Sequence, residues 1–173
     1  MKIRFWSLPL VLVMLFVLHV NSYAADNQIE KEIQDTLKKY ADAYEKRDVK
    51  TIMSLFSTDP KVIFIDGISE FPIVGQDQIK MTFEREFSQI QTSRIEFTKT
   101  YVGGSGDNAW FTTSLIGHIK VENQESPIPA LWSGVMQKTA GKWVIIQSHF
   151  SYVPIVEFEE EPAPSPQTPS QKK

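Results

Sequence analysis

Cysteine is missing from this chain of 173 residues. Disulfide bonds and thiol nucleophiles are therefore excluded, and the hydrophobic core must hold the fold together by itself. Histidine is scarce as well: the chain has three histidines, and none has the His-x-His or His-x-x-x-His spacing that is typical of metal sites. We therefore expect neither a metal site nor a bound cofactor.

Two motifs of common enzymes are also missing. No Gly-x-Ser-x-Gly occurs, so the chain lacks the nucleophile turn of many hydrolases. The glycine-rich stretch GGSGDN at 103–108 lies between two predicted strands and not before a helix. It is typical of a hairpin turn, and it is not a phosphate-binding loop.

An excess of positive charge is missing too. The chain has 18 basic and 21 acidic residues, a formal charge of −3. Residues 1–24 contain Lys2 and Arg4 but no acidic residue, so the rest of the chain has 16 basic against 21 acidic residues, a formal charge of −5. Such a chain has no general attraction for phosphate backbones, and nucleic acid is not expected as a partner.

Only one long hydrophobic run is present, and it lies near the N-terminus at 5–20. Lys2 and Arg4 accompany it, and Ser22-Tyr23-Ala24 offers small residues at the −3 and −1 positions of a cleavage site. This pattern predicts a secretory signal peptide over 1–24. The run is short for a membrane span, so we expect an exported protein, periplasmic or secreted, with no stable membrane span after cleavage.

The C-terminal end differs in composition from the rest of the chain. The stretch EFEEEPAPSPQTPSQKK combines an acidic cluster with four prolines, and it cannot bury apolar surface. We expect a disordered, acidic, Pro-rich tail over 155–173, which leaves one folded domain over 25–154. The tail either solubilises the protein or tethers it to a partner or a cell wall.

The first half of the domain has helical patterns. Apolar residues recur at steps of three and four from Ile29 to Tyr44, which predicts a helix that begins near Asn27 and buries one stripe. Asp48 is placed to cap a short second helix. A third helix is expected after Gly75, because three large apolar residues follow at a spacing of four: Ile79, Phe83 and Phe87.

The second half has strand patterns. A short strand is expected at 61–67, and longer strands are expected at 94–102, 109–121, 130–138 and 141–152. The polar stretch ENQESPIP is expected to connect two of them. Helices that come first and an antiparallel meander that follows predict an α+β fold, with the helices packed on one face of a curved sheet.

In this order of elements, several stretches resemble the nuclear transport factor 2-like superfamily, which includes the SnoaL-like and ketosteroid-isomerase-like domains. The resemblance covers residues 28–152 and rests on YADAYEKRDVKTIMSLFSTDPKVIFIDG, GQDQI and GKWVIIQSHFS. It implies a cone-shaped, curved antiparallel or mixed sheet that wraps around the N-terminal helices, with a pocket inside. It also implies a homodimer through the outer face of the sheet. Such a resemblance indicates a fold rather than a reaction.

Ketosteroid isomerases of this superfamily use a base Asp, a Tyr and a protonated carboxylic acid. By the resemblance, the Tyr corresponds to Tyr40. The base corresponds to Asp66 only with a two-residue insertion, and to Phe64 without one. The second acid corresponds to Ser133. Ketosteroid isomerase activity is therefore not expected, although Tyr40 and Asp66 stay candidates for other catalysis.

The pocket of such a cone is expected to combine aromatic with a few polar side chains. By the resemblance, Phe150 points into the pocket together with Tyr40 and Ser133. Because side chains alternate along a strand, His149 then faces the outer side, unless a bulge reverses the order. The full set of candidate pocket residues is Tyr40, Tyr44, Asp66, Trp110, Ser133, His149 and Phe150.

Three hypotheses for function remain. The first is an exported protein that binds a small, partly apolar molecule without strong catalysis. The second is an isomerase, dehydratase or hydrolase that uses Asp66 with Tyr40, or a histidine such as His118 or His149. The third is a protein-interaction module that uses the sheet face and the tail. We favour the first, because pocket aromatics are present while the catalytic set is incomplete.

Overall fold

The computed structural model describes the backbone of residues 8–154, and it describes side chains from residue 27 onward except that of Val121. The predicted tail over 155–173 and the first part of the predicted signal peptide, 1–7, lie outside the described residues. The described elements follow one another in the order α1-α2-β1-β2-α3-β3-β4-β5-β6. None of the helices in this part of the chain combines the length and the hydropathy that crossing a membrane requires.

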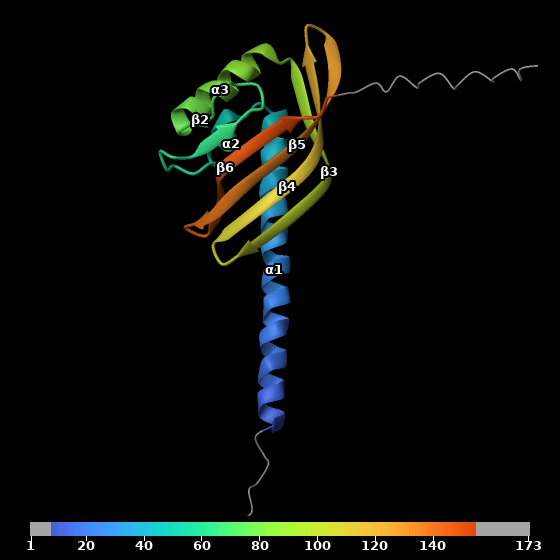
Figure 1. Cartoon of the computed structure of the whole chain (residues 1–173). Coiled ribbons are helices and arrows are strands. Elements are labelled where there is room, and N and C mark those ends of the chain that lie inside the picture. The colour runs from blue at the N-terminus through green and yellow to red at the C-terminus, as the bar shows by residue number, and fades with distance from the viewer. Residues whose placement is uncertain (1–7, 155–173) are drawn as a thin grey trace, which may run out of the picture.

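Helix α1 (Leu8–Glu45) crosses one face of the sheet and continues as a rod well beyond it (Figure 1). It begins at Leu8 rather than near Asn27, so the predicted start of the first helix is wrong. The reason is local: after Pro9, no proline or glycine occurs before Pro60, and nothing interrupts the helix ahead of its apolar stripe. The predicted cleavage site at 22–24 therefore lies within a helix.

Two shorter helices complete the helical part of the domain. α2 (Val49–Met53) is capped as predicted, because the Asp48 carboxylate accepts a hydrogen bond from the Thr51 N–H at 3.0 Å. α3 (Gln76–Gln89) follows Gly75. It buries the three residues that the spacing of four predicts: Ile79, Phe83 and Phe87.

Six strands form one mixed sheet in the order β2-β1-β6-β5-β4-β3. The strands are β1 (Ile63–Ile65), β2 (Ile73–Val74), β3 (Thr92–Ser105), β4 (Asn108–Val121), β5 (Gln124–Thr139) and β6 (Lys142–Tyr152). β3 to β6 form the predicted antiparallel meander, and β1 pairs in parallel with β6. The sheet curves around the helices (Figure 1), which confirms the predicted α+β fold.

Strand β5 begins where a connection was predicted. In ENQESPIP, only Glu122 and Asn123 form the turn, and both have a positive φ, while Pro127 and Pro129 pair with β4 inside β5. β6 reaches β5 only as far as Ala130. This part of β5 therefore has one neighbouring strand, and a missing N–H is tolerated on its open side.

A β-bulge divides β6 into two parts. Val135 of β5 pairs with Gln147, but the next residue, Met136, pairs with Ile145. Ile146 is therefore an extra residue opposite the β5 ladder. The bulge shifts the phase of every side chain that follows it.

The bulge decides which way the end of β6 points. Strict alternation over the whole strand places Trp143 and His149 on the same face. In the structure, Trp143 is buried against α1, whereas Phe150 takes the inner face and His149 lies opposite Ser133 on the outer one. The expectation that Phe150 points inward and His149 outward is confirmed, and that of a single phase along the strand is wrong.

The core is centred on Trp132 of β5, which is fully buried. Its ring centroid lies 4.5 Å from that of Tyr40 and 4.9 Å from those of Phe111 and Phe150. Its indole N–H donates to the Ser148 hydroxyl at 2.6 Å, so the one polar atom of the ring is satisfied in the core. This cluster joins α1 to three strands and forms the base on which the site is built.

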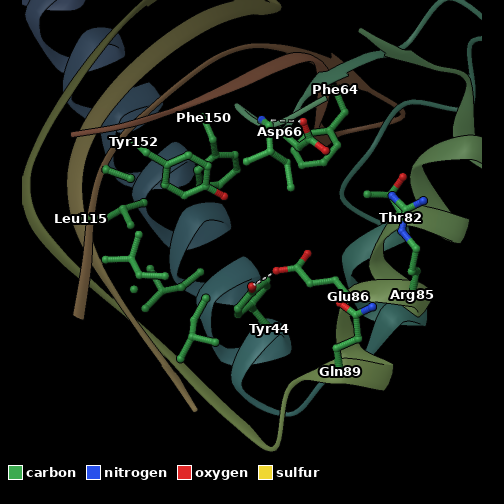
Figure 2. Close-up of a pocket in the computed structure, with 16 residues that line it drawn as sticks. Tyr44, Phe64, Asp66, Thr82, Arg85, Glu86, Gln89, Leu115, Phe150 and Tyr152 are labelled. Carbon is green, nitrogen blue, oxygen red and sulfur yellow. Dashed lines mark hydrogen bonds between the residues drawn. The ribbon is translucent and has the colours of Figure 1, made fainter. Parts of the chain in front are cut away.

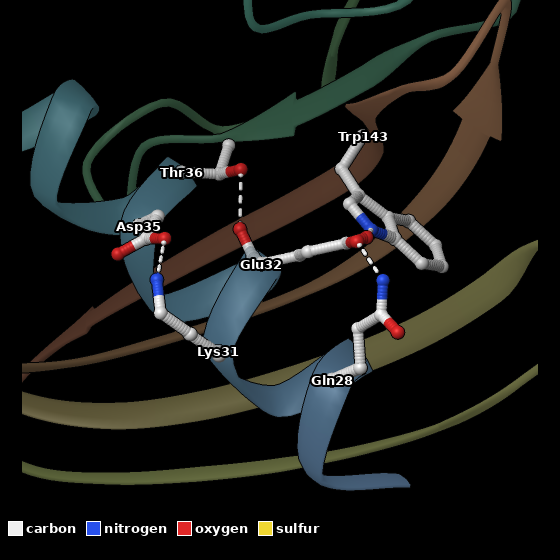
Figure 3. A network of polar contacts seen from close by, with 6 residues as sticks. All are labelled: Gln28, Lys31, Glu32, Asp35, Thr36 and Trp143. Atoms are coloured by element: carbon white, nitrogen blue, oxygen red, sulfur yellow. Dashed lines mark hydrogen bonds and ion pairs between the residues drawn. The ribbon is translucent and has the colours of Figure 1, made fainter. Parts of the chain in front are cut away.

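A polar network fixes α1 to the sheet (Figure 3). One carboxylate oxygen of Glu32 accepts hydrogen bonds from the Lys138 ammonium and the Trp143 indole, each at 2.7 Å. The other oxygen accepts one from the Gln28 amide at 2.9 Å. The hydrogen bond from Lys138, followed by those from Gln28 and Trp143, lowers the pKa of Glu32 to about 2. The helix is thus held at a fixed position across β5 and β6.

Candidate functional site

A cavity of about 200 Å³ lies between the curved sheet and α3 (Figure 2). The wall formed by the sheet is apolar, and its side chains are Ile95, Leu115, Ile119, Ile128, Ala130 and Phe150. The wall formed by α3 is polar, and its side chains are Thr82, Arg85, Glu86 and Gln89. The lining is completed by Gly117 of β4, Tyr44 of α1, Phe64 of β1, Asp66 and Ile68 after β1, and Tyr152 of β6. The cavity therefore has one apolar and one hydrogen-bonding side.

Strand β4 has no side chain at one point of the cavity wall, Gly117. A Cβ placed there would meet one neighbour, the carbonyl oxygen of Ile128, at the ordinary distance of 3.7 Å. The backbone φ of this glycine is not positive, so the turn geometry does not require glycine. A glycine in a strand interior often marks a place where another group approaches the backbone closely.

Glu86 and Tyr44 form the central polar pair of the cavity. The Tyr44 hydroxyl donates a hydrogen bond to Glu86 Oε1. Burial raises the pKa of Glu86 above its usual value; the Tyr44 hydrogen bond opposes this effect, and the charge of Asp66 adds to it. Burial, followed by the charge of Glu86, also raises the pKa of the Tyr44 hydroxyl. Glu86 is thus a carboxyl group that can hold a proton where most carboxyls have lost theirs.

Asp66 lies in the same cavity with the opposite tendency. Burial is the largest effect on its pKa and raises it, but hydrogen bonds from Ser69 and Ile68 together outweigh burial and lower the pKa. The Ser69 N–H and hydroxyl each donate at 2.7 Å, and the Ile68 N–H donates at 3.1 Å. Both carboxylate oxygens are therefore engaged in holding the turn after β1, as in an Asx turn. Asp66 is an ionised group with little freedom to accept a proton.

Tyr152 contributes a third hydroxyl to the cavity. Its ring lies beside Phe150, and its hydroxyl points into the space between the two walls (Figure 2). Burial raises the pKa of Tyr152, and the charges of Glu86 and Asp66 raise it further. The hydroxyl thus stays a neutral donor and acceptor next to two carboxyl groups.

The structure brings three of the seven predicted pocket residues into the lining: Tyr44, Asp66 and Phe150. Tyr40 does not line the cavity. It is 1% exposed and packs against Trp132 beneath the cavity. Burial raises the pKa of Tyr40, followed by the charges of Glu86 and Tyr152, so its hydroxyl lies near the site although its ring belongs to the core.

The other predicted residues lie on the outer face of the sheet. Trp110 is 53% exposed and covers Gly103 of the neighbouring strand, where a Cβ would lie 2.3 Å from its ring. Ser133 and His149 are paired across β5 and β6, in alternation with the buried Trp132. His118 also lies outside the cavity, 3.7 Å from Glu96. Of the histidines whose side chains the structure describes, His118 and His149, neither lines the cavity.

The prediction from sequence missed Glu86, Arg85 and Tyr152 as site residues. Glu86 carried a usable signal, because it lies three residues after Phe83 and thus at the edge of the buried stripe of α3. Side chains at the edge of such a stripe are partly buried, as that of Glu86 is, and can therefore reach a cavity beside the helix. Its partner Tyr44 was a candidate, but the pairing requires a contact between residues 42 positions apart.

The polar groups that line the cavity are carboxyl, hydroxyl, amide and guanidinium groups. Among the described residues, no group of three His, Cys, Asp or Glu side chains is arranged to hold a metal ion. What the cavity brings together is a carboxyl group with a raised pKa, a carboxyl group with a lowered pKa and two tyrosine hydroxyls. Groups whose pKa values are displaced in opposite directions are typical of functional sites.

The fold has relatives of known structure. A nuclear transport factor 2-like superfamily protein from Salmonella enterica is 18% identical, with a TM-score of 0.68 over 78% of this chain and 98% of that one. A candidate dehydratase of the NTF2-like family from Streptomyces avermitilis is 14% identical, with a TM-score of 0.67 over 74% and 99%. A candidate aromatic ring hydroxylase from Novosphingobium aromaticivorans is 21% identical, with a TM-score of 0.66 over 73% and 90%. At these identities the likeness shows the fold alone.

The sequence itself matches a family. No curated protein matches the chain, but the profile of the SnoaL-like domain matches residues 33–156, which include α2, α3, every strand and most of the domain part of α1. This match identifies the chain as a member of the SnoaL-like domain family, and its curved mixed sheet has the fold of the NTF2-like structures.

Proposed function

We propose that this protein binds a small, partly apolar molecule in the cavity between the sheet and α3. The observation that carries the proposal is the division of the cavity into an apolar wall and a wall of hydroxyl and carboxyl groups, a combination that is typical of small-molecule sites. The apolar body of the ligand would lie on the sheet, and its polar group would meet Tyr44, Glu86 and Tyr152.

The volume of the cavity indicates the size of the ligand. At about 200 Å³, it exceeds the roughly 150 Å³ of an engineered apolar cavity that takes up benzene. A ligand body of one aromatic or alicyclic ring therefore fits, with a short polar substituent. Gly117 leaves the backbone of β4 open to such a ring, since no side chain covers it.

The positions of Asp66 and Tyr40, the two candidate catalytic residues, favour binding without strong catalysis. Both oxygens of Asp66 already accept hydrogen bonds within its own turn. Tyr40 belongs to the core cluster and not to the lining. Neither is free to exchange a proton with a ligand, which weakens the enzyme hypothesis that rested on this pair.

A second candidate function is proton transfer with Glu86 as the acid or base. The specific observation in its favour is the raised pKa of Glu86 inside the cavity, beside the Tyr44 hydroxyl, because general acids and bases work best when their pKa lies near the operating pH. One relative in structure is named as a candidate dehydratase. An enzyme of this kind would lose turnover in Glu86→Gln while keeping its affinity for substrate.

Export belongs to the same proposal. The signal-peptide pattern over 1–24 supports it. We also propose that two copies pair through the outer face of the sheet, which exposes Tyr101, Trp110 and Leu131. Sedimentation of the purified protein measures that pairing.

The test of the binding proposal is a titration with benzyl alcohol, a neutral one-ring probe, followed by NMR chemical shifts. Gly117→Val fills the cavity wall with a residue that strands accept readily, so we expect the variant to lose most of its affinity. Thr112→Val, on the outer face of the same strand, is the matched control and should bind like the wild type. A folded Gly117→Val protein with unchanged affinity would place the ligand elsewhere and overturn the proposal.

A further inference from the structure

Building on the proposed function, we propose that the cavity selects a cationic ligand: an amine or ammonium group attached to an apolar body of about one ring. The inference concerns the charge of the ligand, which the fold and the family leave open. Its basis is the arrangement of two carboxyl groups and four aromatic rings around one small space.

The two carboxyl groups of the cavity have no cationic partner. Neither Asp66 nor Glu86 forms an ion pair with any residue that the structure describes, while the ion pairs found there lie elsewhere on the domain. A carboxylate in a partly apolar cavity is stabilised by a cationic partner. Among the described residues, Asp66 accepts only hydrogen bonds from its own turn and the half-buried Glu86 accepts one from Tyr44, so neither carboxyl group has a countercharge there.

Aromatic rings complete the chemistry of a cation site. The cavity is lined by Phe64, Phe150, Tyr44 and Tyr152, and the rings of Phe64 and Phe150 meet edge to face, with centroids 6.0 Å apart. The face of an aromatic ring attracts an ammonium group, most strongly where water is excluded. An ammonium group between Glu86 and these rings would thus gain from both kinds of contact.

Arg85 is the cationic residue among those that line the cavity, and it forms no ion pair with the two carboxyl groups. It is exposed on α3 at the rim, and no ion pair joins it to Asp66 or Glu86 within the described residues. Arg85, Asp66 and Glu86 line the same space. An anionic ligand that contacted Arg85 would therefore also lie close to the two carboxyl groups, which repel a negative charge. The balance of charges inside the cavity therefore favours a cation.

The charged state of the cavity depends on Glu86. Among the groups that face it, burial raises the pKa values of Tyr40, Tyr44 and Tyr152, so these hydroxyls stay neutral, and the lowered pKa of Asp66 keeps that group ionised. Arg85 lies outside at the rim. A bound cation would favour the ionised form of Glu86 and lower its pKa, so binding releases a proton at a pH near the pKa of free Glu86.

The experiment compares three probes with the same ring and different charge: benzylamine, benzyl alcohol and phenylacetate. We expect benzylamine to bind about tenfold more tightly than benzyl alcohol, since a hydrogen bond to a charged group exceeds a neutral one by roughly that factor, and phenylacetate to bind most weakly. Calorimetry of benzylamine binding in two buffers of different ionisation enthalpy should show proton release, and the affinity should rise with pH as Glu86 ionises.

Two variants separate the role of Glu86 from general effects of charge. Glu86→Gln should bring the affinity for benzylamine close to that for benzyl alcohol and abolish the proton release. Glu84→Gln, which removes an exposed carboxyl two residues away on the same helix, should leave both unchanged. Because the probe comparison and the proton release are measured on the wild type, the inference can be tested even if Glu86→Gln folds poorly.

The outcomes distinguish this inference from the proposed function. Equal binding of benzylamine and benzyl alcohol would leave the small-molecule site in place and overturn the selection of a cation. Tightest binding of phenylacetate would also overturn it and would point to Arg85 as the charge that matters. Failure of all three probes to bind would instead overturn the proposed function itself.

Discussion

Tyr44 and Glu86 stand 42 residues apart in the chain and meet through a single hydrogen bond inside the cavity. The first comes from the helix that the sheet wraps, and the second from the helix that closes the cavity on the other side (Figure 2). The bond therefore joins the two helical walls of the site, and it opposes the effect of burial, which raises the pKa of Glu86.

Tyr44→Phe should raise the pKa of Glu86, because the lost hydroxyl is a donor that stabilises the ionised carboxylate. It should also cost about 1 kcal/mol of unfolding free energy, the usual net value of one hydrogen bond. Carboxyl carbon NMR against pH measures the pKa, and Tyr101→Phe on the exposed part of β3 is the control. An unchanged Glu86 titration would mean that the bond does not form in solution.

Because of the network around Glu32, the free energy of unfolding should fall as the pH becomes acidic. The pKa of Glu32 is about 2 in the folded protein, below its unfolded value, so the contribution of this group is fully present above the unfolded pKa. It is lost as the pH falls from there through about 2.

Glu32→Gln should therefore lower the melting temperature at neutral pH and flatten its fall in acid. Thermal unfolding between pH 7 and pH 2 tests this, with the exposed Glu45→Gln on the same helix as the control. If the wild type and Glu32→Gln lost stability in parallel as the pH falls, the prediction would be wrong. The hydrogen bonds from Lys138 and Trp143 would then not stabilise the fold through the charge of Glu32.

Ser148→Ala should destabilise the core because it leaves the Trp132 indole N–H without an acceptor, and not because of the small loss of volume. The Ser148 hydroxyl accepts the Trp132 indole N–H at 2.6 Å, and both residues are fully buried. Leaving that N–H without a partner should cost roughly 1–3 kcal/mol. Urea unfolding gives the value, and Ser151→Ala, exposed on the same strand, should change it little. Equal effects of the two variants would argue against the bond.

Gly67→Ala should be costly for two separate reasons. Gly67 has a φ of +78°, and an added Cβ would lie 2.7 Å from the backbone oxygen of Phe150. Gly106 has a similar φ of +59° but open space around the missing Cβ, so Gly106→Ala pays only the conformational term, about 1 kcal/mol. Unfolding free energies of both variants isolate the steric term, and a Gly67→Ala protein no weaker than Gly106→Ala would contradict the close approach.

Periodicity predicted the helices and most strands, because each pattern needs only neighbours in sequence. The stripe from Ile33 to Tyr44 and the spacing of Ile79, Phe83 and Phe87 placed the buried faces correctly. The start of α1 could not be placed in this way. A predicted signal peptide and the domain helix are joined without a breaker, and helix propensity continues across the join.

The site was harder to predict than the fold. Its orientation depends on Ile146, an extra residue in β6 whose presence follows from pairing with β5 and not from composition. Ser133 was placed in the pocket by the resemblance, although it alternates with the buried Trp132. Glu86 was overlooked because a charged residue on a helix is usually solvated, and only tertiary contacts bury it.

The prolines of β5 affect how the edge of the sheet can associate with another copy of the protein. The Pro129 carbonyl accepts a hydrogen bond from Val153 N–H, so the backbone groups of Pro129 point away from β4. Pro127, two residues earlier, has the same orientation. Val153 therefore covers Pro129, and Pro127 removes an N–H donor from the open edge that extends beyond it. A strand from another molecule cannot form a regular ladder there, which protects this end of the sheet from edge-to-edge aggregation.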